Sequence, residues 1–289
     1  MLRILENKLY MQIIDGRKIS KEILEEVKNE VAKLPFTPIF CDVLVGDDVV
    51  SKQYVNLKRK KAESIGINFC DATFSVTSNT EEVVSKIQDL NHTKNMCGII
   101  VQLPLPGHLD TRAILDAIDP NLDVDALGSI ASQKFYSGES GISFPTALAC
   151  MRLLEEIPDF DKKNIVVLGE GELVGRPVSA LLSRKNISHQ TLNQKSENSV
   201  EILKQGDIII SGIGREGYIK GDMVKEGASI IDAGTSESNG TVVGDADFES
   251  VKDKMSFISP VPGGVGPVTV AMMLKNVLTV AQQKLNINE

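Results

Sequence analysis

NIVVLGEGELVGRPVSALLSRK, residues 164–185, is the stretch that decides the fold of this chain. It predicts a strand over 164–168, a glycine-rich turn over 169–175 and a helix over 177–185. Gly169, Gly171 and Gly175 have a GxGxxxG spacing, a variant of the dinucleotide-binding fingerprint. Glycines let the backbone approach a pyrophosphate, and the helix N-terminus supplies positive potential. By spacing alone, a nucleotide site and a purely structural tight turn are equally well supported.

Strands and helices alternate on both sides of this unit. Downstream, the predicted strands are 190–192, 207–211, 229–233 and 257–259, and a long helix is predicted over 268–285. Upstream, the predicted strands are 39–45, 67–74 and 98–103, and the predicted helices are 20–34, 51–65, 80–91, 111–118 and 146–156. This alternation predicts an α/β fold with parallel sheets and right-handed crossovers. The region 119–143 is predicted to be mostly loop, which indicates a domain boundary near residue 145.

The composition is that of an ordinary soluble globular protein. The chain has 289 residues, of which 42% are apolar and 24% charged, and this length is enough for two modest domains. A formal net charge of -8 argues against general nucleic-acid binding, which needs a basic surface. No apolar run approaches the roughly 18 residues of a membrane span. Residues 1–10 lack the features of a secretory signal, so we predict a cytoplasmic protein whose fold begins at Met11 after a short extension.

The four cysteines do not form a metal-binding pattern. Cys41, Cys70, Cys97 and Cys150 are widely spaced, and no two of them make a CxxC pair. Three of them lie in apolar, strand-like stretches. We therefore predict reduced, mostly buried thiols and no metal site.

One predicted helix carries residues that suit proton transfer. Ser51, Tyr54 and Lys58 are spaced i, i+3, i+7 and so share one face. A tyrosine and a lysine arranged in this way can exchange protons with a ligand if the face lines a cleft. Because Lys60 and Lys61 follow directly, periodicity alone favours the alternative of a solvated basic face.

Polar residues also end the strand 98–103 and occupy the loop behind it. Gln102 would face the crevice where α/β sheets bind ligands, or it would cap its own loop. Asp123 and Asp125 alternate along an extended segment, so one would face inward. A metal ligand, a carboxylate that accepts N–H bonds from a heterocycle, and a loop cap are all compatible with this pattern.

Four segments together resemble a known family. They are VGDDVVSKQYVNLKRKKAESIGI (45–67), GIIVQLPLPGHLD (98–110), LDVDA (122–126) and SPVPGGVGPVTVAMML (259–274). They are similar to the bifunctional methylenetetrahydrofolate dehydrogenase/cyclohydrolases, and the resemblance runs from about residue 13 to residue 282. It implies an N-terminal α/β folate domain over 11–145, completed by the C-terminal helix at 266–289, and a Rossmann-like NAD(P)-binding domain over 146–265.

The resemblance also implies a catalytic set. Lys58 corresponds to the proton-handling lysine of the cyclohydrolase step, and Tyr54 to its neighbour on the helix. Gln102 corresponds to the residue that hydrogen-bonds that lysine, and Asp125 to the carboxylate that holds the pterin ring.

Substrate contacts are expected from two further places. The resemblance places Ser51 with Lys58 and Tyr54 among the residues in contact with the folate. Pro262, Gly263, Gly264 and Val265 match the loop that contacts the aromatic middle of the folate.

The cofactor site is expected around the glycine-rich turn. No acid follows strand 190–192 to hold a free ribose 2′-hydroxyl, and Lys195 and Ser196 at that place favour NADP. A carboxylate at Glu170 would repel a 2′-phosphate, so NAD remains open. We assign these residues to cofactor binding: Gly169, Glu170, Gly171, Gly175, Lys195, Ser196, Gly212 and Thr235.

Three functions follow as expectations. The first is a bifunctional enzyme that oxidises 5,10-methylenetetrahydrofolate with NADP and hydrolyses the methenyl product to 10-formyltetrahydrofolate. The second is a cyclohydrolase with a degenerate nucleotide site, motivated by Glu170 and by the degenerate hinge segment at 144–147. The third is a non-catalytic folate-binding protein. The resemblance also implies a homodimer formed through the Rossmann-like domain, with tetrahydrofolate derivatives as its small-molecule partners.

Overall fold

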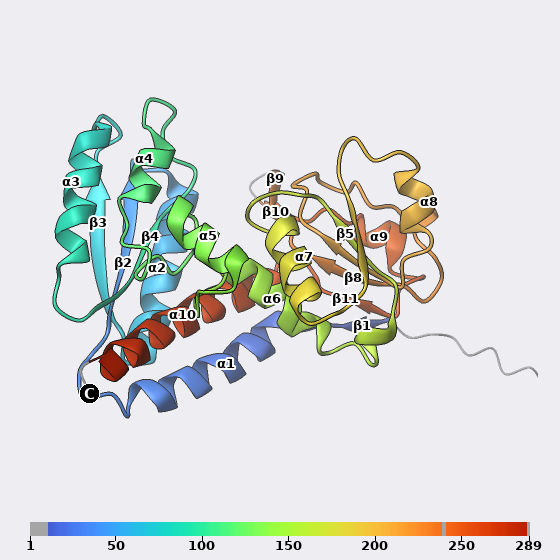
Figure 1. Ribbon diagram of the computed structural model, residues 1–289. Coiled ribbons are helices and arrows are strands. Elements are labelled where there is room, and N and C mark those ends of the chain that lie inside the picture. Colours follow the sequence, from blue (N-terminus) through green and yellow to red (C-terminus); the bar gives the residue numbers. More distant parts are fainter. Residues whose placement is uncertain (1–10, 239–240, 288–289) are drawn as a thin grey trace, which may run out of the picture. The chain divides into compact units, whose positions relative to one another are not determined.

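The computed structural model describes residues 11–238 and 241–287 (Figure 1). These residues form two compact units, one made of residues 11–19 and Thr146–Thr269, the other of Ser20–Pro145 and residues 270–287. Each unit has its own parallel sheet, of six and three strands respectively. The predicted fold class, a two-domain α/β protein, is confirmed. The predicted N-terminal extension, residues 1–10, lies outside the described residues.

The three-stranded unit is built on a sheet of order β3-β2-β4. Its parallel strands are β2 (Ile39–Val45), β3 (Asn68–Phe74) and β4 (Met96–Val101). Helix α2 (Val49–Ser64) packs on β2 and β3, and helix α3 (Thr80–Asn91) packs on β4. Because side chains alternate along a strand, Asp42 of β2 faces α2 and Cys41 faces the opposite side.

Capping residues set where the helices of this unit begin. The side chain of Asp48 accepts a hydrogen bond from Ser51 N at 2.7 Å and starts α2. Asn79 and Glu82 form a reciprocal capping box at the start of α3. Gly66, with a φ of 83°, carries the chain from α2 towards β3.

The region 119–143 contains a helix where mostly loop was predicted. After α4 (Thr111–Asp116), the chain forms α5 over Ser129–Ser137. The helix buries Ala131 and Phe135, one turn apart, and ends at Gly138 in the left-handed conformation. A single buried pair in nine residues is too short a repeat for the helical period to stand out in the sequence.

The six-stranded unit has the order β1-β11-β8-β7-β5-β6, and all pairings are parallel. Its strands are β1 (Gln12–Ile13), β5 (Ile165–Leu168), β6 (His189–Leu192), β7 (Ile208–Ser211), β8 (Ser229–Asp232) and β11 (Phe257–Ile258). Residues 11–19, predicted to belong to the first domain, group here because Gln12 N and Ile14 N donate to the carbonyls of Ser256 and Ile258.

The remaining elements surround this sheet or connect it to the rest of the chain. The helices are α6 (Pro145–Leu154), α7 (Gly175–Arg184), α8 (Ser199–Leu203) and α9 (Phe248–Val251), with 3-10 turns η1 (Phe160–Lys162) and η2 (Gly221–Met223). Strands β9 (Ser236–Ser238) and β10 (Thr241–Val243) pair antiparallel. Of these, α8, α9, β9 and β10 were not predicted, because each has only three to five residues.

Two helices, α1 (Gly16–Val31) and α10 (Val265–Ile287), each have residues in both units. The C-terminal part of α10, from Val270, groups with the three-stranded unit, where Asn276 Nδ2 donates to the carbonyls of Val124 and Ser143. The expectation that no apolar run is long enough for a membrane span was wrong for α10, which could cross a membrane by length and composition. However, 67% of its apolar window is buried inside the protein, as in a core helix.

Candidate active site

A hydrogen bond joins Lys58 and Gln102 in the three-stranded unit. Lys58 Nζ donates to Gln102 Oε1 at 2.8 Å, and Gln102 Nε2 donates to the Leu103 carbonyl at 2.8 Å. The second bond fixes the amide so that its oxygen points to the lysine. Lys58 is only 2% exposed, whereas Lys60 of the same helix is exposed. Lys58 therefore does not belong to the solvated basic face of α2.

Asp42 is a third member of this cluster that the sequence reading did not single out. Its Oδ2 lies 2.6 Å from Lys58 Nζ, and both side chains are buried. Neither of its oxygens has a hydrogen-bond partner among the described residues, so the contact with Lys58 is an ion pair. Burial raises the pKa of Asp42, and the charge of Lys58 opposes that rise. A signal was present, because an aspartate inside the apolar run IFCDVLV (39–45) needs a partner once it is buried.

Tyr54 and Ser51 lie on α2 before Lys58. The Tyr54 ring centroid is 5.5 Å from Lys58 Nζ, within the range of a cation–π contact. Tyr54 is 38% exposed, yet loss of solvent raises the pKa of its hydroxyl, and the charge of Asp125 adds to the rise. Ser51 is half-buried, and its backbone N–H serves the helix start at Asp48.

The two aspartates of LDVDA (122–126) differ in their surroundings. Asp123 accepts from Gly128 N at 2.7 Å and from Asp125 N at 3.2 Å, so it caps its own loop. Burial raises its pKa to about 6. Burial raises the pKa of Asp125 to about 7, with Lys58 lowering it and Asp123 and Asp42 raising it further. At neutral pH, Asp125 can therefore both donate and accept a hydrogen bond.

Metal binding finds no support in this cluster. Within residues 11–238 and 241–287, no group of three or more His, Cys, Asp or Glu side chains is arranged to hold an ion. The arrangement instead offers a buried amine, a fixed amide oxygen and titratable carboxyls, which are the groups that proton transfer requires.

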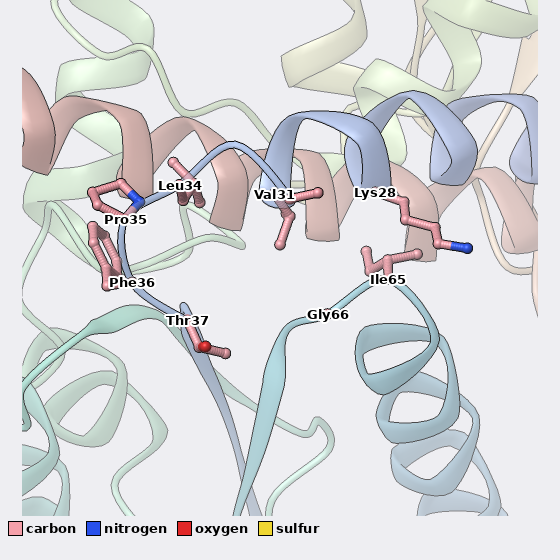
Figure 2. Close-up of a pocket in the computed structure, with 9 residues that line it drawn as sticks. Lys28, Val31, Leu34, Pro35, Phe36, Thr37, Ile65 and Gly66 are labelled. Carbon is pink, nitrogen blue, oxygen red and sulfur yellow. The ribbon is translucent and has the colours of Figure 1, made fainter.

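A pocket of about 420 Å³ lies elsewhere in the same unit (Figure 2). It is lined by Lys28, Val31, Ala32, Leu34, Pro35, Phe36, Thr37, Ile65 and Gly66. These residues come from the end of α1 and from the segments that lead into β2 and β3, at the amino ends of the strands. Gln102 follows the carboxyl end of β4, the edge at which parallel sheets bind ligands. The pocket is therefore separate from the Lys58 cluster.

The glycine-rich turn joins β5 to α7 in a form that fits a pyrophosphate. A Cβ at Gly175 would lie 1.8 Å from the Gly169 carbonyl oxygen, so the turn closes only with glycine there. A Cβ at Gly171 would meet no atom within 4 Å. Val174, at the N-cap of α7, makes no side-chain cap, and within the turn Arg176 N donates to the Gly171 carbonyl at 3.2 Å. Gly212 packs against Val174, where a Cβ would lie 2.6 Å away.

The turn after β6 holds both a carboxylate and a lysine. Glu170 Oε2 accepts a hydrogen bond from Asn193 Nδ2 at 2.6 Å. In dinucleotide folds the end of this second strand meets the adenosine ribose, and Asn193 holds the Glu170 carboxylate at that end of β6. Asn193 also binds the backbone N–H of Lys195 at 2.8 Å, and its own N–H donates to Ser196 Oγ at 2.9 Å.

Two buried carboxylates, not predicted from the sequence, organise the loops that follow β7 and β8. Asp245 accepts three hydrogen bonds of 2.7, 2.9 and 2.7 Å from residues 211–215. Asp232 accepts three of 2.9, 3.1 and 2.8 Å from residues 234–246, and burial raises its pKa to about 6. Thr235 is exposed within the second of these loops.

The predicted folate-contacting loop, Pro262 to Val265, lies between β11 and α10 in the six-stranded unit. Gly264 N donates to the Pro260 carbonyl at 2.7 Å. A Cβ at Gly16 would lie 1.8 Å from the Gly264 carbonyl oxygen, so the loop packs directly on the start of α1. Contact of this loop with a folate stays a prediction.

Two family models match the chain. Residues 14–125 match the catalytic domain of tetrahydrofolate dehydrogenase/cyclohydrolase, and residues 145–285 match its NAD(P)-binding domain. The bifunctional protein FolD of Campylobacter hominis is 42% identical over 280 residues, which cover 95% of this chain and 99% of that protein.

Solved structures agree with these matches. The bifunctional enzyme FolD of Campylobacter jejuni has a TM-score of 0.89 and 35% identity, covering 95% of this chain and 99% of that chain. The FolD of Trypanosoma brucei, solved with NADP and an inhibitor, has a TM-score of 0.87 and 33% identity, covering 95% and 98%.

Proposed function

The chain belongs to the tetrahydrofolate dehydrogenase/cyclohydrolase family, and from this premise we propose that it is a bifunctional enzyme of one-carbon folate metabolism. It oxidises 5,10-methylenetetrahydrofolate to 5,10-methenyltetrahydrofolate with NADP, and it hydrolyses that product to 10-formyltetrahydrofolate. The match of both domains and the nearly complete coverage of FolD relatives support both activities.

The dehydrogenase step requires mainly that two bound molecules be aligned. When bound, NADP supplies the acceptor for the hydride that leaves the methylene carbon. The chain contributes the glycines that let its backbone approach the pyrophosphate: Gly169, Gly171, Gly175 and Gly212. Lys195 and Ser196 are assigned to the ribose 2′-phosphate, and Thr235 to the loop beside the cofactor.

The cyclohydrolase step uses the Lys58 cluster. Water attacks the methenyl carbon, a C–O bond forms, and one O–H proton passes to the Lys58 amine. Ring opening then breaks a C–N bond and requires that a proton be returned to the nitrogen. We assign Gln102 to orienting the lysine, Tyr54 to the wall of the site and Asp125 to the pterin ring.

The observation that carries this proposal is the burial of Lys58 in contact with Gln102. A protein that only binds folate would not need an amine removed from solvent, because burying a charge is unfavourable unless a partner compensates. We further propose that Ser51 and the loop from Pro262 to Val265 complete the folate site.

Replacing Lys58 tests the assignment. We expect Lys58→Ala to lower the rate of methenyltetrahydrofolate hydrolysis by about 10² to 10⁴, since a positioned base contributes that much. The loss of methenyltetrahydrofolate absorbance measures the rate. Lys60→Ala, an exposed lysine on the same helix, is the matched control and keeps the wild-type rate. Full hydrolysis by Lys58→Ala would refute the role of Lys58.

A cyclohydrolase without dehydrogenase activity is the second candidate, because the Glu170 carboxylate lies at the ribose end of the turn. Titration of the purified protein with NADP and with NAD separates the two candidates. Turnover of methylenetetrahydrofolate with either nucleotide excludes the second.

Assembly and location complete the proposal. We propose a homodimer formed through the six-stranded unit, and a cytoplasmic enzyme. Light scattering coupled to size-exclusion chromatography should give twice the 31.4 kDa of one chain. A mass of a single chain at micromolar concentration would contradict the dimer.

A further inference from the structure

Helix α2 places two consecutive basic residues over two acids of the sheet. Asp42 and Asp71 are register partners on β2 and β3, so their side chains share one face. Arg59 pairs with Asp71, and Lys58 pairs with Asp42. The Arg59 pair is 35% and 38% exposed, whereas the Lys58 pair is 2% and 0% exposed. The exposed pair contributes little to stability. In the buried pair, each charge depends on its partner for compensation.

We propose that Asp42 is a positioning residue for the hydrolytic step. Its carboxylate holds Lys58 as an ammonium against Gln102, and it thereby sets the pH above which Lys58 becomes a free amine that can take a proton from water. This inference rests on the proposed function of Lys58 as the base.

The contacts around the amine support this role. An ammonium has three N–H donors; one lies on Gln102 Oε1 at 2.8 Å and a second faces Asp42 Oδ2 at 2.6 Å. Neither Asp42 oxygen makes a hydrogen bond among the described residues, so the ion pair with Lys58 compensates the buried charge of Asp42. Each member of the pair therefore favours the charged form of the other.

Other titratable groups also face the amine. The Tyr54 ring on α2 lies 5.5 Å from the amine, and Asp125, in the loop after α4, interacts electrostatically with Lys58 and with Asp123. Burial raises the pKa of Asp125 to about 7, so its charge is partly lost at neutral pH. Asp123 uses its oxygens on its own loop. Asp42 is thus the carboxylate in direct contact with the ammonium.

A consequence for the two reactions follows from charge. Dehydrogenation creates a cationic methenyl group, and an ammonium cannot accept the proton that water must lose when it attacks that cation. Lys58 must first release its proton to solvent; the amine then takes the proton of the attacking water as the C–O bond forms. The rate of hydrolysis should therefore rise with pH, and Asp42 should shift that rise to higher pH.

Replacing Asp42 by asparagine tests this in the whole enzyme. We expect Asp42→Asn to move the half-maximal pH of methenyltetrahydrofolate hydrolysis down by about one unit or more, since an adjacent opposite charge has an effect of that size. On the acidic limb, the rate at a fixed pH then rises about tenfold for each pH unit by which the profile moves. Asp71→Asn, the register partner, leaves the profile in place, and Asp42→Glu keeps the wild-type half-maximal pH. Equal loss of rate at every pH in Asp42→Asn would overturn the proposal.

A measurement on the wild-type protein covers the case in which Asp42→Asn does not fold. With ¹³Cε-labelled lysine, NMR follows the charge of Lys58 against pH, with its signal assigned by its absence in Lys58→Arg. We expect an ammonium at pH 7 that persists in Asp42→Glu; a neutral amine at pH 7 would overturn the proposal. This readout needs no turnover. An enzyme without hydrolase activity would therefore refute the proposed function while leaving the effect of Asp42 measurable.

Discussion

We propose that Glu170 affects the choice between NADP and NAD. Asn193 holds its carboxylate at the end of β6. There the carboxylate would repel the 2′-phosphate of NADP and accept a hydrogen bond from the 2′-hydroxyl of NAD. We expect Glu170→Gln to raise the affinity for NADP relative to NAD about tenfold, the equivalent of about 1.4 kcal/mol. Binding titrations with both nucleotides measure the ratio directly, and kcat/KM for each is the second readout.

Glu172→Gln, which neutralises an acid in the same turn, is the control for a general effect of charge. An unchanged ratio in Glu170→Gln, or an equal shift in both variants, would show that Glu170 does not face the ribose.

The residues of the candidate site were predicted unevenly from the sequence. Lys58, Gln102 and Asp125 were proposed because each lies in a motif that resembles the family, and the first two do meet in the structure. Asp42 was missed because a single aspartate does not change the prediction of a buried strand for a run of apolar residues. Its partner lies on the following helix, and only the packing of α2 on β2 brings the two together.

At the scale of elements, the β5–α7 turn makes a sharp prediction about two glycines. Gly175→Ala would place a Cβ 1.8 Å from the Gly169 carbonyl, so we expect the turn to open, NADP binding to be lost and the melting temperature to fall. Gly171→Ala meets no atom within 4 Å, so it should fold normally and bind NADP about tenfold more weakly, because a methyl group there obstructs the pyrophosphate.

Nucleotide titration and thermal denaturation together separate the two effects. Gly107→Ala, whose Cβ also meets nothing within 4 Å but which lies in the three-stranded unit, is the neutral control. Normal NADP affinity in Gly171→Ala would place the pyrophosphate away from this turn. Both turn variants should keep cyclohydrolase activity, since the Lys58 cluster lies in the other unit.

Long elements with clear periodicity were predicted well, and short ones were not. The strand–turn–helix unit around Gly169 is present with boundaries shifted by about two residues. Helix α5 and the hairpin of β9 and β10 were missed, because three to nine residues carry too little pattern. Their stability comes from tertiary contacts, such as the burial of Phe135, which the local sequence does not reveal.

For the whole molecule, buried carboxyls predict an acidic stability optimum. Burial raises the pKa of Asp123 and Asp232 to about 6 and that of Asp125 to about 7, from 3.8. A group with a raised pKa favours the folded state most below its unfolded pKa, and this contribution is lost progressively as the pH rises from about 4 through 6 to 7. Hydrogen bonding to Lys225 lowers the pKa of Asp207, whose contribution is lost as pH falls below its ordinary value.

Urea denaturation between pH 4 and pH 8 tests this balance. We expect the midpoint to be highest near pH 4, to fall as the pH rises to about 7 and to level off above that. Asp125→Asn, which removes the carboxyl with the highest of these pKa values, should flatten the fall above pH 6. A midpoint that rises steadily from pH 5 to 8 would contradict the burial of these groups.

The division of the whole chain could be anticipated only in part. The loop before residue 145 and the new glycine-rich unit pointed to two domains. The assignment of residues 11–19 to the six-stranded unit could not be read from the sequence, because a two-residue strand has no periodicity and its partner β11 lies more than two hundred residues away.

The seclusion of Lys58 also makes it an internal reporter of motion. Acylating reagents modify amines that solvent can reach, so they should label the exposed lysines of α2 within a short reaction time. Lys58 is only 2% exposed, so a reagent much larger than water should modify it mainly while α2 lifts from the sheet, as a protected amide proton exchanges mainly during local opening. Its labelling half-life, followed by mass spectrometry, would therefore time the opening of this helix without any engineered probe.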